Sequence, residues 1–293
     1  MIRCFTLASW VLLMSACTAP RAMTQSGRVT PKGDVNVGIH YLGNIGSESS
    51  RSLFEGFEAA VDEVLADDQV EYDETVAELT RAVVAYSLDP IGMAPHLSLR
   101  YGIYDHLDIG YQYAFGAHVF DGRVQFLGST SSDEMSMIYA SIGAQYSSQT
   151  YDLPSYFKLD KLQERLGFEM KRKDILVPLT VGHPFGSRGQ YGSINYGLAY
   201  GHTSLDYGFD PINVYEKYVE DVDTQPIAAI HNTKSYDSLG GFMNLKAGYE
   251  PIFVTASLAL YHQEFGDFEL IGGDSVHLGG WTLIPTVGIE GTF

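Results

Sequence analysis

Two residues in the second half of the chain carry side chains that could act together on an ester. His202 and Ser204 stand two positions apart, with Thr203 between them. In a β-strand they would share one face, because side chains two residues apart point the same way. A histidine beside a serine can take the hydroxyl proton and turn the serine into a nucleophile. The nearest acids that could orient the histidine are Asp206, Asp210 and Asp237.

Other catalytic patterns are absent from the sequence. There is no Gly-x-Ser-x-Gly, His-Glu-x-x-His, phosphate-binding loop or dinucleotide fingerprint. The nine histidines are scattered without the spacing of metal ligands. We therefore expect no cofactor and no specific metal centre.

Composition narrows the class of protein. The 293 residues are 45% hydrophobic and only 18% charged, with a net charge of -18. An acidic chain repels phosphate, so nucleic acid is not an expected partner. Aromatic residues make up 13% of the chain and include 20 tyrosines, which is too many large side chains for a disordered acidic tail.

The N-terminus predicts export. Arg3 precedes a mainly apolar stretch of 12 residues, Phe5 to Ala16, which is too short to span a bilayer as a helix. The run Leu13-Met14-Ser15-Ala16-Cys17 resembles the lipobox of bacterial lipoproteins, which implies a signal peptide over 1–16 and a lipid-modified Cys17. Residues 17–33 would then form a lipidated linker before the folded domain, 34–293. The alternative is an ordinary secretory signal with an incidental cysteine.

Alternation with a period of two dominates after residue 33. In the last segment, Trp281, Leu283, Val287, Ile289 and Phe293 share one face, while the other face is mostly small or polar. This segment resembles the closing strand of bacterial outer-membrane β-barrels. The resemblance implies that Phe293 is part of the signal read by the barrel assembly machinery.

Ten segments carry strand signals, which predicts an all-β, transmembrane antiparallel barrel of about ten strands, with eight or twelve as alternatives. Short and long connections alternate, as expected for a barrel with both chain ends in the periplasm and long outer loops. The fourth segment has the weakest signal. The segments are 34–42, 94–103, 107–116, 119–127, 136–146, 174–183, 190–201, 238–249, 251–262 and 281–293.

The polar faces of these segments carry small residues and a few isolated charges. That composition suits a narrow lumen in which charges pair, rather than a water-exposed face. We expect the following charged residues to face the lumen: Arg100, Asp108, Arg123, Lys246 and Glu290.

One insert breaks the alternation. Residues 44–92 place apolar side chains at helical spacing in two runs and hold 12 acids and 2 bases. We predict an acidic helical hairpin between the first two strands. Acid also gathers in loop 202–237, where Glu220-Asp221-Val222-Asp223 is densest, so divalent cations bridging to anionic lipopolysaccharide are possible partners.

The His202–Ser204 pair resembles the His-x-Ser pair of outer-membrane phospholipase A and of the lipid A 3-O-deacylases. Those families continue with asparagine after the serine, whereas Leu205 follows here. The sequence therefore favours a non-enzymatic outer-membrane lipoprotein of structural, surface-interaction or narrow-pore type. A lipid-facing acyl esterase is one alternative. A hydrophobic-ligand carrier, with Phe242, Phe253 and Tyr261 on the inward face, is another.

Overall fold

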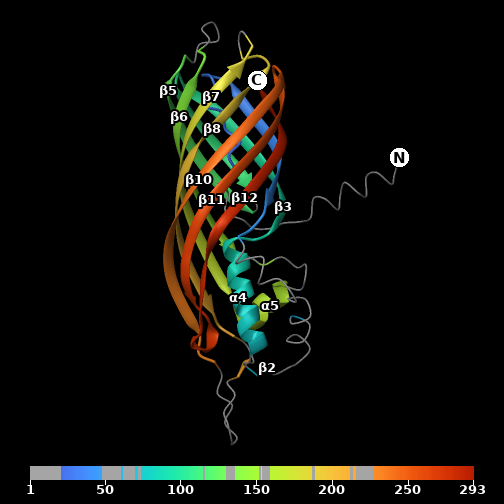
Figure 1. Ribbon diagram of the computed structural model, residues 1–293, viewed down its shortest axis with the longest axis vertical. Helices are drawn as coiled ribbons and strands as arrows, with labels where there is room; N and C mark the ends of the chain where they lie inside the picture. Colours follow the sequence, from blue (N-terminus) through green and yellow to red (C-terminus); the bar gives the residue numbers. More distant parts are fainter. Residues whose placement is uncertain are drawn as a thin grey trace, which may run out of the picture.

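The computed structural model describes residues 21–47, 61, 70–71, 74–114, 116–129, 136–151, 153, 159–186, 189–211, 214–215 and 227–293. Ten antiparallel strands close into a barrel, each pairing with the next along the chain, and the first pairs with the last (Figure 1). The predicted barrel of ten strands is confirmed, including the weakly signalled fourth. The strands are β1 Val35–Asn44, β3 Gly92–Tyr104, β4 Leu107–Ala114, β5 Ala117–Leu127, β6 Tyr139–Tyr151, β7 Glu169–Phe185, β8 Gly192–Phe209, β10 Ile230–Tyr249, β11 Ile252–Glu269 and β12 Ser275–Thr292.

The two ends of the barrel differ. At one end, here called the turn end, the links are 105–106, 128–138, 186–191 and 250–251, and Phe293 pairs with Val35 there. At the other, the loop end, the links are 45–91, 115–116, 152–168, 210–229 and 270–274. The alternation of short and long connections follows the predicted order in part. At the loop end both 115–116 and 270–274 are short, because β11 and β12 extend into the predicted loop 263–280, and at the turn end 128–138 is the longest link.

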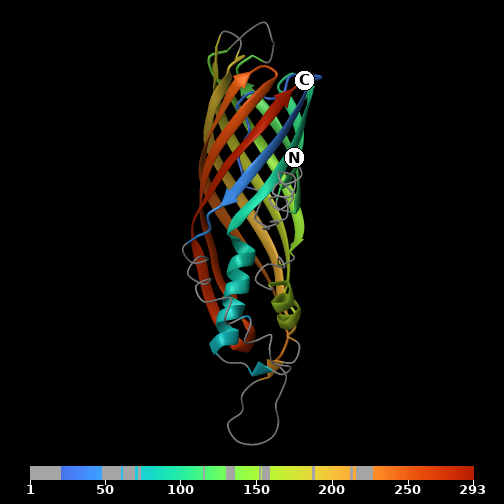
Figure 2. The same cartoon turned by 90° about the vertical axis from the view of Figure 1, so that its right-hand side faces the viewer.

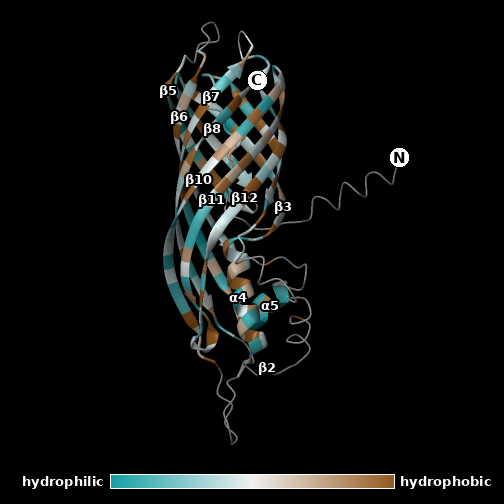
Figure 3. Ribbon diagram, viewed as in Figure 1, coloured by the Kyte–Doolittle hydropathy of each residue, from teal (hydrophilic) through white to brown (hydrophobic). Residues whose placement is uncertain are grey.

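The wall has an apolar outer face around the turn-end half of the barrel, where hydrophobic and hydrophilic residues alternate along the strands (Figure 3). Inward side chains are mostly small, polar or charged, and buried. Their parity is set by the strand period, so one sequence pattern serves both faces. Exposed outer residues of this apolar belt include Ile39, Leu97, Tyr113, Phe120, Ile142, Leu179, Leu198, Leu239, Leu258, Trp281 and Ile289.

Six strands run at least five residues further toward the loop end than the sequence predicted. β6, β7, β8, β10, β11 and β12 continue beyond the belt into segments that were expected to be loops, and form a curved sheet on one side of the loop end (Figure 2). The inner face of this extension is apolar, with Leu205, Phe209 and Phe268 fully buried, while its outer face is polar. The ladder continues because its inner face has a partner to pack on.

That partner is α4, Glu74–Leu88, with α5, Leu159–Leu166, beside it. Val76, Leu79 and Val83 of α4 join one core cluster with Phe168, Leu205, Phe209 and Phe268 of the barrel strands and loops. The second half of the predicted hairpin is thus a helix, whereas most of the first half lies outside the described residues. The sequence did not predict α5. Two small elements complete the loop end: the parallel pair β2 Val70–Glu71 and β9 Val214–Tyr215, and the 3-10 turn Ile271–Gly273.

No helix among the described residues is long and apolar enough to cross a membrane.

Candidate functional site

Four charged side chains meet inside the barrel near the turn end. Arg100 donates to Asp108 at 2.6 Å and also to Asp121, and Arg123 donates to the two oxygens of Asp108 at 3.1 and 2.5 Å. All four are buried, and two positive charges face two negative ones. Because a buried charge is stable only when it is paired, this cluster joins β3, β4 and β5 through their inward side chains.

The N-terminal segment, residues 21–34, lies inside the lumen. Thr30 N–H donates to Asp108 at 2.8 Å, Val29 N–H to Gln125 at 3.0 Å, and Gly27 N–H to Asn195 at 3.1 Å. Nearer the loop end, wall side chains donate to its carbonyls: Asn244 to Gln25 at 2.7 Å, Ser257 to Met23 at 2.6 Å, and Tyr261 to Arg21 at 2.9 Å. The segment expected to be a linker therefore plugs the barrel.

Glycines let this segment lie against the wall. A Cβ on Gly102 of β3 would come within 2.0 Å of the Pro31 carbonyl oxygen, and one on Gly27 within 2.5 Å of the Gly182 nitrogen. Side chains at these positions would push the segment off the wall, because in each case the obstacle is backbone.

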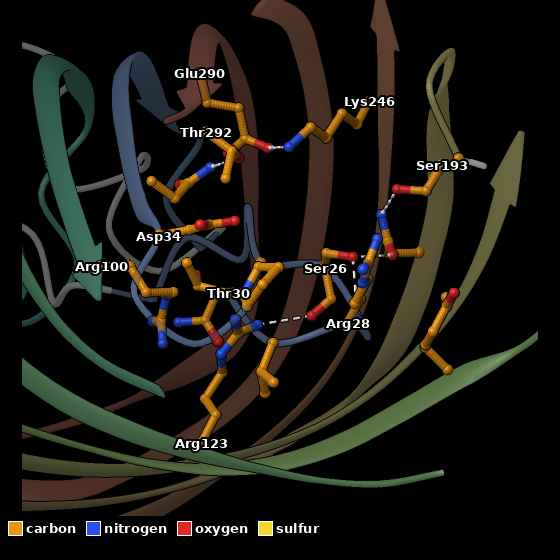
Figure 4. A pocket seen from close by; sticks show the side chains of 18 of the residues that line it. Ser26, Arg28, Thr30, Asp34, Arg100, Arg123, Ser193, Lys246, Glu290 and Thr292 are labelled. Atoms are coloured by element: carbon orange, nitrogen blue, oxygen red, sulfur yellow. Dashed lines mark hydrogen bonds and ion pairs between the residues drawn. The ribbon is translucent and has the colours of Figure 1, made fainter. Parts of the chain in front are cut away.

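Between this segment and the wall lies a cavity of about 900 Å³ at the turn end, which we call the vestibule (Figure 4). Its lining is mostly polar and includes Arg28, Asp34, Arg100 and Arg123. Lys246 reaches across to Glu290 at 2.7 Å, and its ammonium lies 4.4 Å from the centre of the Phe253 ring. Lys246 and Glu290 thus pair with each other, separately from the four-residue cluster.

Side chains fill the lumen between the vestibule and the loop end. Met23 is fully buried in a cluster with Phe242, Tyr261 and Leu42. One step closer to the loop end, Arg21 donates to Thr203 at 3.2 Å and Tyr236 at 3.3 Å, and Arg172 pairs with Asp174 at 2.9 Å. Phe242 and Tyr261 thus belong to one buried cluster with Met23, whereas Phe253, the third residue of the predicted ligand pocket, lines the vestibule.

Asp89 holds the end of α4 in place. We call α4, together with α5, the helical cap. Asp89 is 3% exposed and accepts hydrogen bonds from Asn44 of β1 at 2.9 Å, Ser47 N–H at 2.6 Å and Thr282 of β12 at 2.8 Å. Because Asp89 follows α4 directly, these bonds tie the end of the helix to the mouth of the barrel.

His202 and Ser204 both lie on the outer face of β8, at the loop-end edge of the apolar belt. Asp237 of β10 is the cross-strand partner of His202, and their side chains are 2.8 Å apart at Nδ1 and Oδ1. Tyr200 also donates to Asp237 at 2.8 Å. No hydrogen bond joins the described side chains of Ser204 and His202. The structure thus brings the histidine and an orienting acid together, with the serine beside them.

Beyond the belt, His277 lies between two carboxylates. Its Nδ1 is 2.8 Å from Asp267 and its Nε2 is 2.8 Å from Glu264, and all three are exposed. The hydrogen bond to Asp267, helped by the charge of Glu264, raises the pKa of His277.

We predict that His277 titrates above the ordinary histidine pKa of about 6.5. Because the folded-state pKa is raised, its stabilising effect is full at pH below about 6.5 and is lost as pH rises through the pKa of His277. NMR titration of the imidazole would measure it. Asp267→Asn should lower this pKa, whereas Glu269→Gln, on a carboxylate that contacts Asn232 instead, should not. An unshifted imidazole in the unmodified protein would contradict the pairing.

Some predicted sites fall outside the described residues. These are Cys17 and the acidic run 220–223. Among the residues that the structure does describe, no three acids, histidines or cysteines are arranged to hold a metal ion.

Other charged residues of the lumen were not predicted. Asp121 has the same strand parity as Arg123, and Asp174 lies on the inward face of the predicted strand 174–183, so alternation alone could have found both. Arg21, Arg172 and Asp89 lie outside the alternating segments, where no pattern in the sequence marks a residue as lumenal.

The solved structures that resemble this chain are bacterial outer-membrane barrels. Ail, the attachment invasion locus protein of Yersinia pestis, is 11% identical, with a TM-score of 0.34 over 89% of this chain and 99% of that one. OprG from Pseudomonas aeruginosa is 10% identical, with a TM-score of 0.29 over 92% and 99%. The protease OmpT from Escherichia coli is 9% identical, with a TM-score of 0.35 over 92% and 100%.

With TM-scores this low, these likenesses carry no argument about function, and the fold assignment rests on the strand pairing itself. No protein-family model matches the sequence, and no curated protein is similar to it.

Proposed function

We propose that the protein is an integral barrel of the bacterial outer membrane whose loop end presents a folded surface for interaction outside the cell. The apolar belt supports the membrane placement, because its large exposed side chains are stable only against lipid. The turn end would face the periplasm, which fits short periplasmic turns and longer outer loops.

The observation that carries the interaction role is the lobe beyond the belt. Six extended strands, α4 and α5 share one apolar core that lies outside the belt. A chain that only had to seal a barrel would need no such core. A rigid lobe supplies a fixed surface at little ordering cost when a partner binds.

Several finer expectations belong to this proposal. Outer-membrane lipid and lipopolysaccharide would surround the wall, and divalent cations would bridge the acidic loops to the latter. The barrel assembly machinery would read Phe293, which pairs with Val35 at the barrel seam. Lipid on Cys17 would add a second anchor to a barrel that its apolar belt already holds in the membrane.

Membrane placement can be tested by heat-modifiability on a gel combined with outer-membrane fractionation. We expect a band that shifts on boiling, and we expect Cys17→Ala to stay with the outer membrane because the belt suffices to hold it. Release of Cys17→Ala into the periplasm would contradict an integral barrel.

The closed lumen predicts an electrically silent protein. In planar bilayers we expect no stable conductance steps from the intact chain. The buried residues around Met23 and the hydrogen-bonded side chains around Arg21 fill the lumen between the vestibule and the loop end. An open porin in the same bilayers serves as the positive control. Reproducible steps of one size would favour the narrow-pore function instead.

A second candidate function is hydrolysis of an acyl ester by Ser204. The contact between His202 and Asp237 favours it, since a carboxylate that holds Nδ1 leaves Nε2 to take a proton from the serine. The site lies on the lipid side of the wall, where acyl chains are present.

If this candidate is correct, Ser204→Ala should reduce release of fatty acid from phospholipid vesicles or lipopolysaccharide at least 100-fold. Ser235→Ala, on the cross-strand neighbour of Ser204, is the matched control and should keep full activity. Equal and negligible release by the unmodified protein and by Ser204→Ala would eliminate the esterase.

A further inference from the structure

The path of residues 21–34 through the lumen indicates the direction in which the chain before them leaves the barrel. We infer that the N-terminal part of the exported chain is threaded through the barrel, so that its first residues leave at the loop end, on the cell surface. The statement that the exit is on the cell surface rests on the orientation proposed above. The threading itself rests only on contacts within the lumen.

The path starts at the turn end. Gly33 N–H donates to the Gly102 carbonyl at 2.9 Å, and Gly102 N–H donates to that of Asp34 at 3.1 Å. Gly27 is bonded to Asn195, only three residues from the beginning of β8. Up to this point the segment circles inside the turn-end mouth, around the vestibule.

From Gly27 the segment rises along the barrel. Arg21 donates to Thr203, eight residues further along β8 than Asn195. The backbone contacts give the same direction, because the carbonyls of Gln25, Met23 and Arg21 are bonded in turn by Asn244, Ser257 and Tyr261. Tyr261 lies four residues closer to the loop end along β11 than Ser257, so the segment runs toward the loop end over this stretch.

Arg21 lies close to the rim of the loop end on the short side of the barrel. It borders a small void with Val119, which is two residues from the β4–β5 turn at that rim. The way back is filled, because Met23 is fully buried and the wall bonds to the carbonyls of residues 21, 23 and 25. A chain continuing from Arg21 has its short exit at the loop end.

This direction differs from the expectation that the N-terminus stays in the periplasm. Cys17 precedes Arg21 by four residues in the sequence, and four residues of chain span at most about 14 Å. Acyl chains on Cys17 would therefore reach the outer leaflet beside β3 to β5, rather than the periplasmic leaflet near the turn end.

Threading itself is tested by a cross-link. Met23→Cys paired with Ser257→Cys should form a disulfide in the full-length protein under mild oxidation, detected as a linked peptide by mass spectrometry. The matched control is Met23→Cys with Ser98→Cys, in the middle of β3 on the lining of the vestibule, which should form none. A disulfide with Ser98 and none with Ser257 would overturn the threading.

Surface exit is tested by labelling intact cells with a membrane-impermeant maleimide. In the lipidation-deficient background Cys17→Ala, we expect labelling of Thr18→Cys and of Ser275→Cys, which is exposed at the loop end. Labelling of Ser275→Cys alone would overturn the surface exit while leaving the proposed orientation intact. Labelling of neither in intact cells, but of both after permeabilisation, would overturn that orientation and the surface exit with it.

Discussion

Replacing Asp108 with alanine is expected to destabilise the barrel by about 3–5 kcal/mol, since removal of one partner leaves buried charges uncompensated. Asp108 accepts from Arg100, from Arg123 and from Thr30 N–H, and all of these groups are buried. Without it, two arginines would share the single carboxylate of Asp121. Urea unfolding in detergent micelles, followed by fluorescence, measures the loss.

Glu290→Ala is the matched control for this variant. It also removes an acid from the lumen, but its partner Lys246 lines the vestibule and can be hydrated when the pair is lost. We expect a loss of about 1 kcal/mol or less, as for solvent-accessible pairs. Equal losses for the two variants would mean that the four-residue cluster contributes no more than an ordinary pair.

The barrel could be predicted from the sequence because the two faces of a strand meet different surroundings, and the residues therefore alternate in polarity with a period of two. Lipid on one side and a narrow lumen on the other force residues such as Leu258 and Ser257 to alternate, and this alternation is local. All ten segments were found in this way. The same parity put Arg100, Asp108 and Arg123 on one face, but it could not say that these three meet, because contact across strands depends on register.

What escaped prediction depends on contacts between distant segments. The extension of β8 beyond residue 201 is stabilised by α4, more than a hundred residues earlier, so the run looked like an ordinary polar loop. Residues 21–33 are held by wall side chains such as Asn195, Asn244 and Ser257, which lie far along the chain. No pattern within the segment itself indicates that it lies in the lumen rather than forming a linker.

The polar outer pair was a different case. His202 and Ser204 could be placed on one face by their spacing, but the sequence could not choose among Asp206, Asp210 and Asp237, and the last of these is 35 residues from His202. The antiparallel register of β8 and β10 selects Asp237, because it puts that residue directly opposite His202. Register is set by the whole hairpin, so no local rule could have made this choice.

The helical cap is expected to come loose when Asp89 is replaced by alanine. Asp89 accepts three hydrogen bonds that join the end of α4 to β1 and β12. Each bond to a charged group contributes about 1.5–3 kcal/mol, and since the three are not additive we expect a loss of about 3 kcal/mol in docking of the cap. The barrel wall should remain folded, because its ladder does not include Asp89.

Limited trypsin digestion measures this effect at Arg81, in the middle of α4. Cleavage requires local opening of the helix, so a loss of about 3 kcal/mol should speed it about 100-fold. Glu74→Ala, an exposed acid in the first turn of the same helix, should change the rate little. Asp89→Asn keeps an acceptor oxygen and should fall between the two. If Asp89→Ala were cut no faster than Glu74→Ala, the cap would be held by its apolar contacts alone, and the lobe would keep its surface without any tie to the mouth of the barrel.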